Sequence, residues 1–364
     1  MQITTIAGGV GAARMLRALG ATWGPSSLTA IVNVADDELV NGLPVSPDID
    51  SILYTLAGAN DEQRGWGLGG ETWQAMSMLR RYAEANGRSD IGWFNLGDLD
   101  LGSHMYRAVR LAEGAALDVV TAEMARAWGL ELRIVPVTND RLSTKLHTED
   151  GRLDFQEYFV REHHEVAVTG VEFDGTDTAT AAPGVLGSIA GADVIVIAPS
   201  NPIVSVGPVL AVRGVRDAIE ARREVAVAVS PIIGGKALKG PADRLLRELG
   251  HESSALGVAR MYVDLVSTMV IDTVDADLAP DIEALGMTVV VTDTIMSDLD
   301  IARRLALSTV EAITGTASST PHAASGGPSG ANCESSASRA SVRSPVEPTL
   351  PPQSAPPSSC ATAT

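Results

Sequence analysis

Short, continuous hydrophobic runs alternate with amphipathic segments through most of this chain. Each run has five to seven residues and most are rich in β-branched residues, which is typical of strands buried on both faces of a parallel sheet. Several segments between them have the spacing of helices with one apolar face. The predicted helices span residues 12–20, 208–221, 241–249 and 297–313, and the predicted strands span 2–7, 28–34, 131–137, 193–198, 224–229, 268–272 and 287–292.

This alternation predicts an α/β protein with an open, mostly parallel sheet. Residues 60–128 interrupt it, because they contain about three helical patterns and no convincing strand. We therefore expect a helical insertion at about 60–128, within one domain formed by residues 1–315.

The composition changes abruptly at about residue 316. The tail, 316–364, is rich in Ser, Ala and Pro, and it holds eight of the 19 prolines of the chain. A segment with so little apolar surface to bury cannot offset the entropy of an ordered chain, so we expect the tail to be disordered.

The net charge of the 364-residue chain is −18, and the four charges of the tail cancel. A large negative field repels nucleic acids and anionic membranes, so neither is an expected partner. There is no apolar stretch long enough to span a membrane and no pattern of a secretory signal in MQITTIAGG, so we expect a cytoplasmic protein. Both cysteines lie in the tail, which leaves no cysteine-based metal site in the rest of the chain.

Polar and small residues follow each predicted strand. The carboxyl ends of parallel strands share one edge of the sheet, and in open α/β sheets ligands bind at that edge. The first such loop, AGGVGAARM at 7–15, places three glycines between a strand and a helix. Glycines there allow backbone N–H groups to approach a phosphate at the helix N-terminus. Arg14 replaces the third glycine of a dinucleotide fingerprint and no G-K-[ST] follows, so we expect a phosphate or nucleotide loop of another type, with a plain strand–helix turn as the alternative.

The second loop carries an acidic cluster without a basic residue. Asp36 and Asp37 follow the predicted strand 28–34, and Asp48 and Asp50 precede the apolar run SILYTLAG. Helix capping explains one aspartate, but it does not explain four. Mg²⁺ prefers oxygen ligands and is commonly held by one or two carboxylates together with substrate phosphates. The cluster therefore indicates a metal-binding or catalytic role, with caps in a solvated loop as the alternative.

Two further loops offer polar groups with less specific patterns. APSNPIVSVGP, 198–208, supplies Ser200 and Asn201, which could contact a base or sugar or simply form a capped turn. NLGDLDLGSH, 95–104, supplies Asp98, Asp100 and His104, where an isolated histidine more often has a structural role.

These motifs together resemble the 2-phospho-L-lactate transferase family of coenzyme F420 biosynthesis, some members of which are described as phosphoenolpyruvate transferases. The resemblance rests on seven motifs in order within residues 1–313: AGGVGAAR, IVNVADD, SPDIDSILYTLAG, RGWGLGGETW, LGDLDLGSH, APSNPIVSVGP and SPIIGGKALKGPA. It implies a Rossmann-like, homodimeric, Mg²⁺-dependent enzyme. The implied reaction transfers a phospholactyl or phosphoenolpyruvyl group from a guanosine diphosphate-linked donor to the deazaflavin Fo, giving (dehydro) coenzyme F420-0 and GMP.

The resemblance also assigns roles to residues. Gly8, Gly9 and Gly11 are expected to cradle the diphosphate, and Ser200, Asn201 and Pro202 to line the guanosine side. Asp36, Asp37 and Asp48 are the expected metal ligands, Asp48 and Asp50 the catalytic pair, and Asp50, Asp98 and Leu99 the acceptor contacts. Leu99 departs from the family, which often has a basic residue at this position.

Two other functions compete with this interpretation. The broken glycine pattern counts against a dinucleotide-dependent dehydrogenase. A non-enzymatic, nucleotide-sugar-binding regulator of the gluconeogenesis-factor type shares the glycine loop and the V-A-D-D segment. In that family a Gly/Ser-rich stretch follows, whereas here DDELVNG leads to SPDIDS, which favours the transferase.

Overall fold

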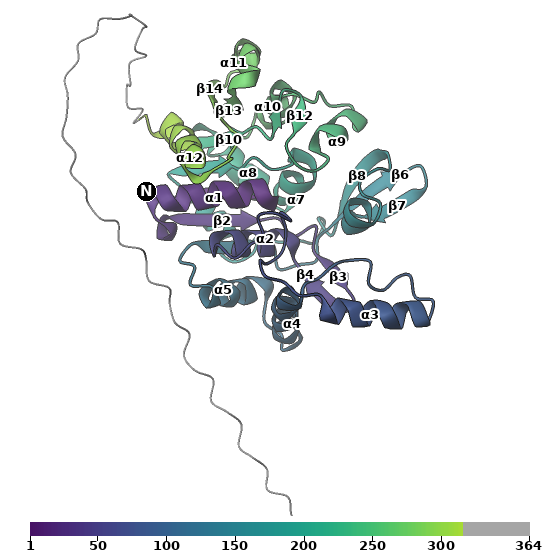
Figure 1. Ribbon diagram of the computed structural model, residues 1–364. Coiled ribbons are helices and arrows are strands. Elements are labelled where there is room, and N and C mark those ends of the chain that lie inside the picture. Colours follow the sequence, from purple (N-terminus) through teal and green to yellow (C-terminus); the bar gives the residue numbers. More distant parts are fainter. Residues whose placement is uncertain (316–364) are drawn as a thin grey trace, which may run out of the picture. The chain divides into compact units, whose positions relative to one another are not determined.

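The computed structural model describes residues 1–315, and the tail predicted to be disordered lies outside them. A seven-stranded sheet organises this part of the chain, and all its strands pair in parallel (Figure 1). The strand order is β14-β13-β10-β9-β1-β2-β5. The strands span Ile3–Ala7 (β1), Leu28–Val32 (β2), Arg133–Pro136 (β5), Val194–Ile197 (β9), Ala226–Val229 (β10), Thr268–Asp272 (β13) and Thr288–Thr292 (β14).

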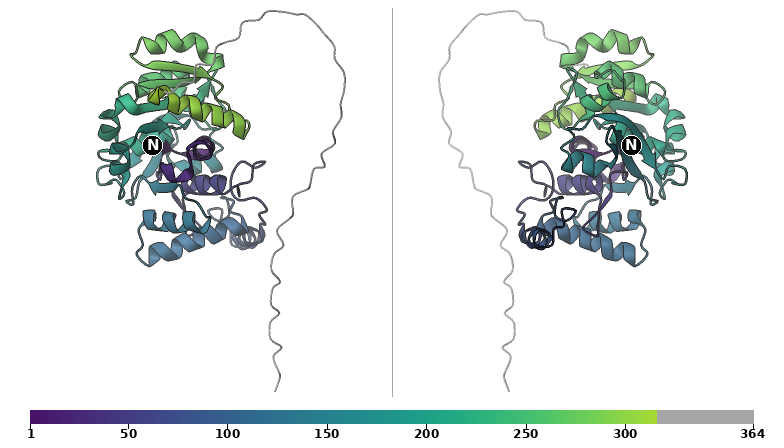
Figure 2. Two further views of the ribbon diagram at one scale, coloured as in Figure 1. Left: turned by 90° about the vertical axis from the view of Figure 1, so that its left-hand side faces the viewer. Right: turned by 90° about the vertical axis from the view of Figure 1, so that its right-hand side faces the viewer.

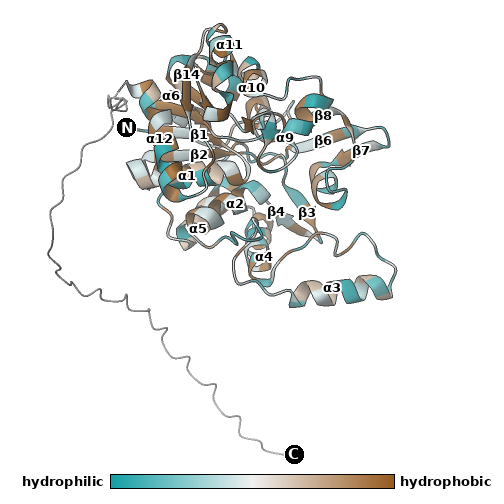
Figure 3. Cartoon of the chain, turned by 45° about the horizontal axis from the view of Figure 1, so that its top comes forward, coloured by the Kyte–Doolittle hydropathy of each residue, from teal (hydrophilic) through white to brown (hydrophobic). Residues whose placement is uncertain are grey.

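These strands are the seven that the hydrophobic runs predict, so the α/β class and the parallel sheet are confirmed. All residues of β1, β9, β10 and β13 are buried, as continuous apolar runs require. Figure 3 shows hydrophobic residues along strands such as β14, whereas peripheral helices such as α3 and α9 carry hydrophilic stretches.

Helices fill the connections between these strands. They span Gly9–Trp23 (α1), Pro47–Leu56 (α2), Gln74–Ala85 (α3), Asp98–Ala112 (α4), Leu117–Ala127 (α5), Val185–Ala190 (α6), Gly207–Ala211 (α7), Val215–Glu220 (α8), Ala242–Glu248 (α9), Ala255–Tyr262 (α10), Ala279–Glu283 (α11) and Leu299–Thr314 (α12). Helix α1 packs against α2 and α12, and α5 packs against α4 and β5. In Figure 2 the blue helices between residues 74 and 127 lie together below the purple α1 and α2. No helix among residues 1–315 is long and apolar enough to cross a membrane.

The predicted helix 208–221 is wrong as a single element. Val212 is extended and ends α7, and Gly214, whose φ of +80° is left-handed, precedes the first residue of α8. A π-helical turn, Pro202–Val206, precedes α7.

Three small antiparallel sheets are absent from the sequence-based prediction. The largest has the strand order β7-β6-β8, and the other two are the hairpins β3–β4 and β11–β12. Their strands are Glu38–Val40 (β3), Leu43–Val45 (β4), Ser143–Thr148 (β6), Gly151–Asp154 (β7), Val168–Asp174 (β8), Ile232–Ile233 (β11) and Lys236–Ala237 (β12). The hairpin β3–β4 matters for the site, because it connects Asp36 and Asp37, which precede it, to Asp48 and Asp50 at the start of α2.

Candidate active site

The strand order of the sheet has its switch point between the adjacent, parallel strands β1 and β9. The connection after β1 leads to β2 on one side, and the connection after β9 leads to β10 on the other. Loops that leave neighbouring strands in opposite directions open a crevice at the carboxyl edge of a sheet, where ligands of open α/β proteins bind. The glycine loop at residues 8–11 and the loop at residues 199–205 are the two loops at this point.

These two loops are in direct contact. The Ser200 hydroxyl donates a hydrogen bond to the Gly8 carbonyl over 2.9 Å. A Cβ on Gly8 would lie 2.8 Å from the Ser205 Cβ, and a Cβ on Gly11 would lie 2.4 Å from the Pro199 carbonyl oxygen. Gly8 and Gly11 are therefore required by the close approach of the second loop, while Gly9 is favoured by its φ of +73°. The structure brings Gly8, Gly9, Gly11 and Ser200 together. Their predicted contacts with a diphosphate and a guanosine stay predictions.

Asn201 and Pro202 shape the second loop locally. The Asn201 side-chain oxygen accepts hydrogen bonds from Ile203 N at 2.9 Å and Val204 N at 3.4 Å. Asn201 thus caps the π-helical turn, and the buried Pro202 occupies its first position. The capped-turn alternative describes this contact, and a role of the two residues toward guanosine stays a prediction.

Asp48 links the acidic segment to the glycine loop. Its Oδ1 accepts a hydrogen bond from Gly9 N at 2.7 Å, and its Oδ2 accepts one from Asn33 Nδ2 at 3.0 Å. Asn33 follows β2. The Ala35 N–H donates a hydrogen bond to Asn33 Oδ1 and so fixes this side chain. Burial raises the pKa of Asp48 to about 6, although both hydrogen bonds act in the opposite direction. A buried carboxylate with neutral partners thus lies directly at the N-terminus of α1.

Asp36 and Asp37 add more negative charge in the same place. Burial, followed by repulsion from Asp48, raises the pKa of Asp36 well above its ordinary value. Burial also raises the pKa of Asp37, against the hydrogen bond that Ser46 Oγ donates to its Oδ2 over 2.6 Å. The Oδ1 atoms of both residues are buried without a hydrogen-bond partner among the described residues. These two open oxygens are unusual for a packed interior.

The predicted magnesium ion can be tested against this arrangement. Among residues 1–315, no three His, Cys, Asp or Glu side chains form a ready-made ligand set. Magnesium is usually bound through one or two carboxylates and takes its other ligands from water and phosphate. The unpaired Oδ1 atoms of Asp36 and Asp37, close to Asp48, fit this mode of binding. The assignment of the three residues as metal ligands stays a prediction.

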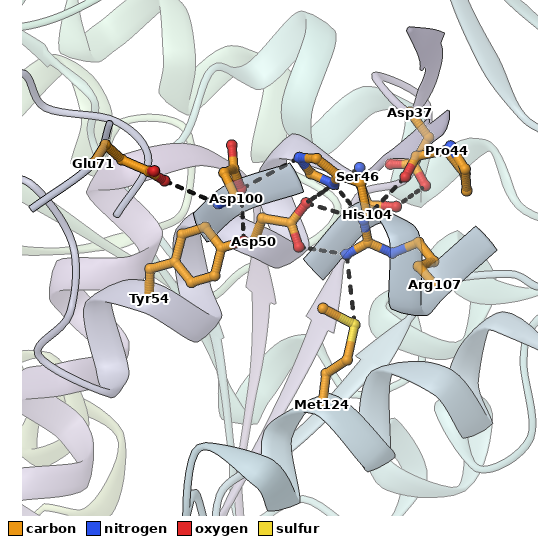
Figure 4. Close-up of polar contacts among 10 residues, drawn as sticks. All are labelled: Asp37, Pro44, Ser46, Asp50, Tyr54, Glu71, Asp100, His104, Arg107 and Met124. Atoms are coloured by element: carbon orange, nitrogen blue, oxygen red, sulfur yellow. Dashed lines mark hydrogen bonds and ion pairs between the residues drawn. The ribbon is translucent and has the colours of Figure 1, made fainter. Parts of the chain in front are cut away.

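Asp50 belongs to a different polar cluster, which Figure 4 shows. Arg107 of α4 donates from both terminal nitrogens to the Asp50 carboxylate, with Nη1 3.2 Å from Oδ2 and Nη2 bonded to Oδ1. His104, one turn earlier, places Nδ1 3.7 Å from Asp50 Oδ2 and Nε2 3.3 Å from Asp100 Oδ1. Tyr54 donates its hydroxyl to Asp100 over 2.7 Å. Burial would raise the pKa of Asp100, but hydrogen bonds from His104 and Tyr54 outweigh it and lower that pKa.

The sequence-based prediction missed Arg107, gave His104 only the structural role usual for an isolated histidine, and assigned no role to Asp100. Their spacing of four and three residues places all three on one face of α4. That pattern was the available signal, together with the absence of a cation among the aspartates at 36–50. The arginine comes from 57 residues further along the chain, so no local motif contains the pair.

Asp98 and Leu99 lie at the start of α4 and have separate environments. The Asp98 carboxylate accepts hydrogen bonds from Gln74 N and Ala75 N, both at 3.1 Å, and so caps α3. Glu71 in turn caps α4, because it accepts bonds from Leu99 N at 2.8 Å and Asp100 N at 2.9 Å. Asp98 is thus occupied by a cap, while the Leu99 side chain is 56% exposed.

A pocket of about 460 Å³ opens beside Leu99. Ser103, one of its lining residues, precedes His104 in α4. Its other lining residues include Gly58, Asn60, Leu68 and Trp128. The indole of Trp128 packs edge-on against Tyr54, with the ring centres 6.1 Å apart. Leu99 thus lines this pocket, while the Asp98 carboxylate turns toward α3. The role of either residue toward an acceptor stays a prediction.

Comparisons with known proteins agree with this architecture. The model of the family described as "2-phospho-L-lactate transferase CofD" matches residues 3–306. A phosphoenolpyruvate transferase of Kitasatospora aureofaciens is 39% identical over 314 residues, which cover 84% of this chain and 96% of the relative. A phosphoenolpyruvate transferase of Mycobacterium avium is 40% identical over 314 residues, with 79% and 92% covered.

A solved structure shares the fold at low sequence similarity. It is a UPF0052 family member from Bacillus halodurans, with a TM-score of 0.55, 17% identity and coverage of 86% of this chain and 98% of that one. This similarity shows the fold alone. The family match across nearly the whole described part confirms the resemblance that the motifs indicate. The chain belongs to the 2-phospho-L-lactate transferase CofD family and is a transferase.

Proposed function

We propose that this chain transfers a phosphorylated three-carbon group from a guanosine diphosphate-linked donor to the deazaflavin Fo, and that GMP is released. Family membership supports the reaction class. The similar proteins from Kitasatospora aureofaciens and Mycobacterium avium are phosphoenolpyruvate transferases, which favours a phosphoenolpyruvyl over a phospholactyl group. The product would then be dehydro coenzyme F420-0.

The observation that carries this proposal is the position of Asp48 at the switch point. The N–H of Gly9, which a phosphate loop would offer to an anion, already donates to Asp48 at 2.7 Å. A diphosphate bound there would meet a carboxylate, and two like charges at hydrogen-bond distance need a cation or a proton between them. Mg²⁺ would supply that charge, and the buried, unpaired Oδ1 atoms of Asp36 and Asp37 are the groups that would hold it.

The chemistry requires few groups from the protein. The acceptor hydroxyl oxygen attacks the phosphorus that carries the three-carbon unit. The bond from this phosphorus to the bridging oxygen breaks, and that oxygen leaves with GMP. Transfer of this kind depends mainly on positioning and charge stabilisation, and one carboxylate suffices to take the hydroxyl proton. Asp48 suits this step, since its pKa of about 6 is close to neutral.

The acceptor is proposed to occupy the pocket beside Leu99. The pocket is bordered by Trp128 and by the helix that carries Asp100 and His104. A planar ring can pack on the apolar wall beside Trp128. Leu99 supplies no charge, so this contact is expected to be one of packing.

The direct test is product analysis. Purified full-length protein is incubated with Fo, Mg²⁺ and each of the two guanosine-linked donors, and products are read by mass. We expect one GMP per transferred group, a preference for the phosphoenolpyruvyl donor, and loss of turnover in EDTA that Mg²⁺ restores. Absence of product with both donors would refute the proposed function, and full activity in EDTA would refute the metal assignment alone.

A further inference from the structure

The acidic segment 36–50 contains no basic residue, and the structure supplies one from elsewhere. Arg107 comes from the middle of α4 and has a 1% exposed side chain. Its guanidinium forms an ion pair with the Asp50 carboxylate (Figure 4). Burial disfavours a guanidinium charge, but the charge of Asp50 outweighs burial and raises the pKa of Arg107.

The contacts of Arg107 reach beyond Asp50. Its Nη1 also donates to the Pro44 carbonyl at 3.2 Å, at the end of the β3–β4 hairpin. Asp50 in turn accepts a bond from Ser46 N at 3.3 Å, and the Ser46 hydroxyl donates to Asp37 at 2.6 Å. One guanidinium thus bonds directly to Pro44 and Asp50, and it is connected through Asp50 to Ser46 and Asp37.

Taking the proposed function as its basis, the geometry points to Arg107 as a positioning residue for the transfer reaction. Its planar fork fixes the orientation of Asp50 and the path of the segment that carries Asp37 and Asp48. Its side chain is only 1% exposed, so we expect it to act through the groups that it holds, chiefly Asp50. A misplacement of catalytic groups by about 1 Å can cost about 100-fold in rate, which is the kind of loss this fork prevents.

Lysine is the informative replacement. It keeps the positive charge, so Asp50 still has a counter-ion, but its ammonium cannot form the two parallel bonds of a guanidinium. A residue that only neutralises charge would tolerate this change, whereas a residue that sets an orientation would not.

The test is a double-mutant cycle on turnover with both substrates saturating. It compares Arg107→Lys, Asp50→Asn and the double variant with the wild type. We expect Arg107→Lys to lower kcat by about tenfold or more, while KM for each substrate changes by less than about threefold. In the Asp50→Asn background, the same change should lower kcat by no more than about twofold, because the group through which it acts is already altered.

Arg110→Lys is the matched control. Arg110 lies one turn further along α4 and pairs with Glu123 over 2.9 Å, on the partly exposed face of the helix. Its replacement removes a similar fork from the same helix and should leave kcat unchanged. If Arg107→Lys fails to fold, Arg107→Ala with added methylguanidinium replaces it, and recovery of kcat by the free cation is then expected.

Two outcomes would overturn the inference. One is a kcat of Arg107→Lys within about twofold of the wild type. The other is a double variant whose loss of kcat equals the product of the losses in the two single variants. For the alanine variant, a failure of methylguanidinium to raise kcat would have the same meaning. An inactive wild type would instead contradict the proposed function, so the two failures are distinguishable.

Discussion

Asp48 and Asp50 are two residues apart, yet their surroundings give them different chemistry. Asp48 accepts hydrogen bonds from the neutral donors Gly9 and Asn33, and its pKa rises to about 6. Asp50 faces the full positive charge of Arg107. When the environments of two acids differ in this way, the group with the raised pKa is the better candidate for proton transfer. We therefore propose that Asp48 accepts the proton of the acceptor hydroxyl and that Asp50 has an orienting role. The motifs alone favoured Asp50 for contact with the acceptor.

The raised pKa of Asp48 predicts a pH dependence of stability. In the folded protein this carboxyl holds its proton up to about pH 6, whereas its ordinary value is 3.8. Its favourable contribution is therefore fully present below about pH 4 and is lost as the pH rises through about 6. A rise of the pKa from 3.8 to about 6 corresponds to about 3 kcal/mol of stability. The free energy of unfolding in chelator should fall over this range relative to Asp48→Asn, and chemical denaturation of both proteins measures it. A difference that stays constant with pH would contradict the assignment.

The elements of the central sheet were predictable, because their signal is continuous and local. Every residue of β9 and β10 is apolar and buried, so each run reads as a strand without knowledge of its partners. The sheet β7-β6-β8 was not predictable in this way. Its strands are short or half-exposed and include Lys145, Arg152 and Glu172, whose pairing becomes visible only in three dimensions.

The same distinction holds for the site. The glycine loop and the aspartates at 36–50 were predictable because their residue types are unusual in those positions. The contact of Gly11 with Pro199 and the pair of Asp50 with Arg107 were not, because each joins residues far apart in sequence. The aspartate cluster indicated that a cation was needed, but the sequence did not indicate its source.

At the scale of elements, the contact between the two switch-point loops predicts the effect of Gly11→Ala. The new Cβ would lie 2.4 Å from the Pro199 carbonyl oxygen, which belongs to the backbone and must move with its loop. Overpacking of this kind typically costs about 1–3 kcal/mol, and we expect a lower melting temperature together with lost turnover.

Gly187→Ala provides the control for this substitution. Gly187 lies in α6, and an added Cβ there meets nothing within 4 Å. Alanine should be neutral or slightly stabilising at this position, because it favours a helix over glycine. A Gly11→Ala protein with normal melting temperature and turnover would contradict the described contact.

At the scale of the molecule, the functional part is the one that the family model matches, residues 3–306. The sheet, the acidic segment and the pocket beside Leu99 all lie within it. The homodimer implied by the resemblance remains a prediction, and sedimentation of the full chain measures it directly.

The composition of residues 316–364 predicts that they are dispensable. They contribute no net charge and little apolar surface, and they begin beyond the family match. Truncation after Thr316 should therefore leave the melting temperature and the rate of product formation unchanged. A large loss of either would show that the tail contributes to the folded protein or to its reaction.

The most direct test of the account is the turnover of Asp48→Asn. The buried Asp48 carboxylate lies against the glycine loop as the proposed proton acceptor, and asparagine keeps its shape but removes its charge. We predict a folded protein whose kcat is at least about 100-fold lower, as expected when a positioned proton acceptor is lost. Asp193→Asn is the control. Asp193 is exposed at the opposite end of β9, where it accepts a hydrogen bond from Gln2 N, and this variant should have normal turnover. A folded Asp48→Asn protein with near-normal kcat would contradict the account.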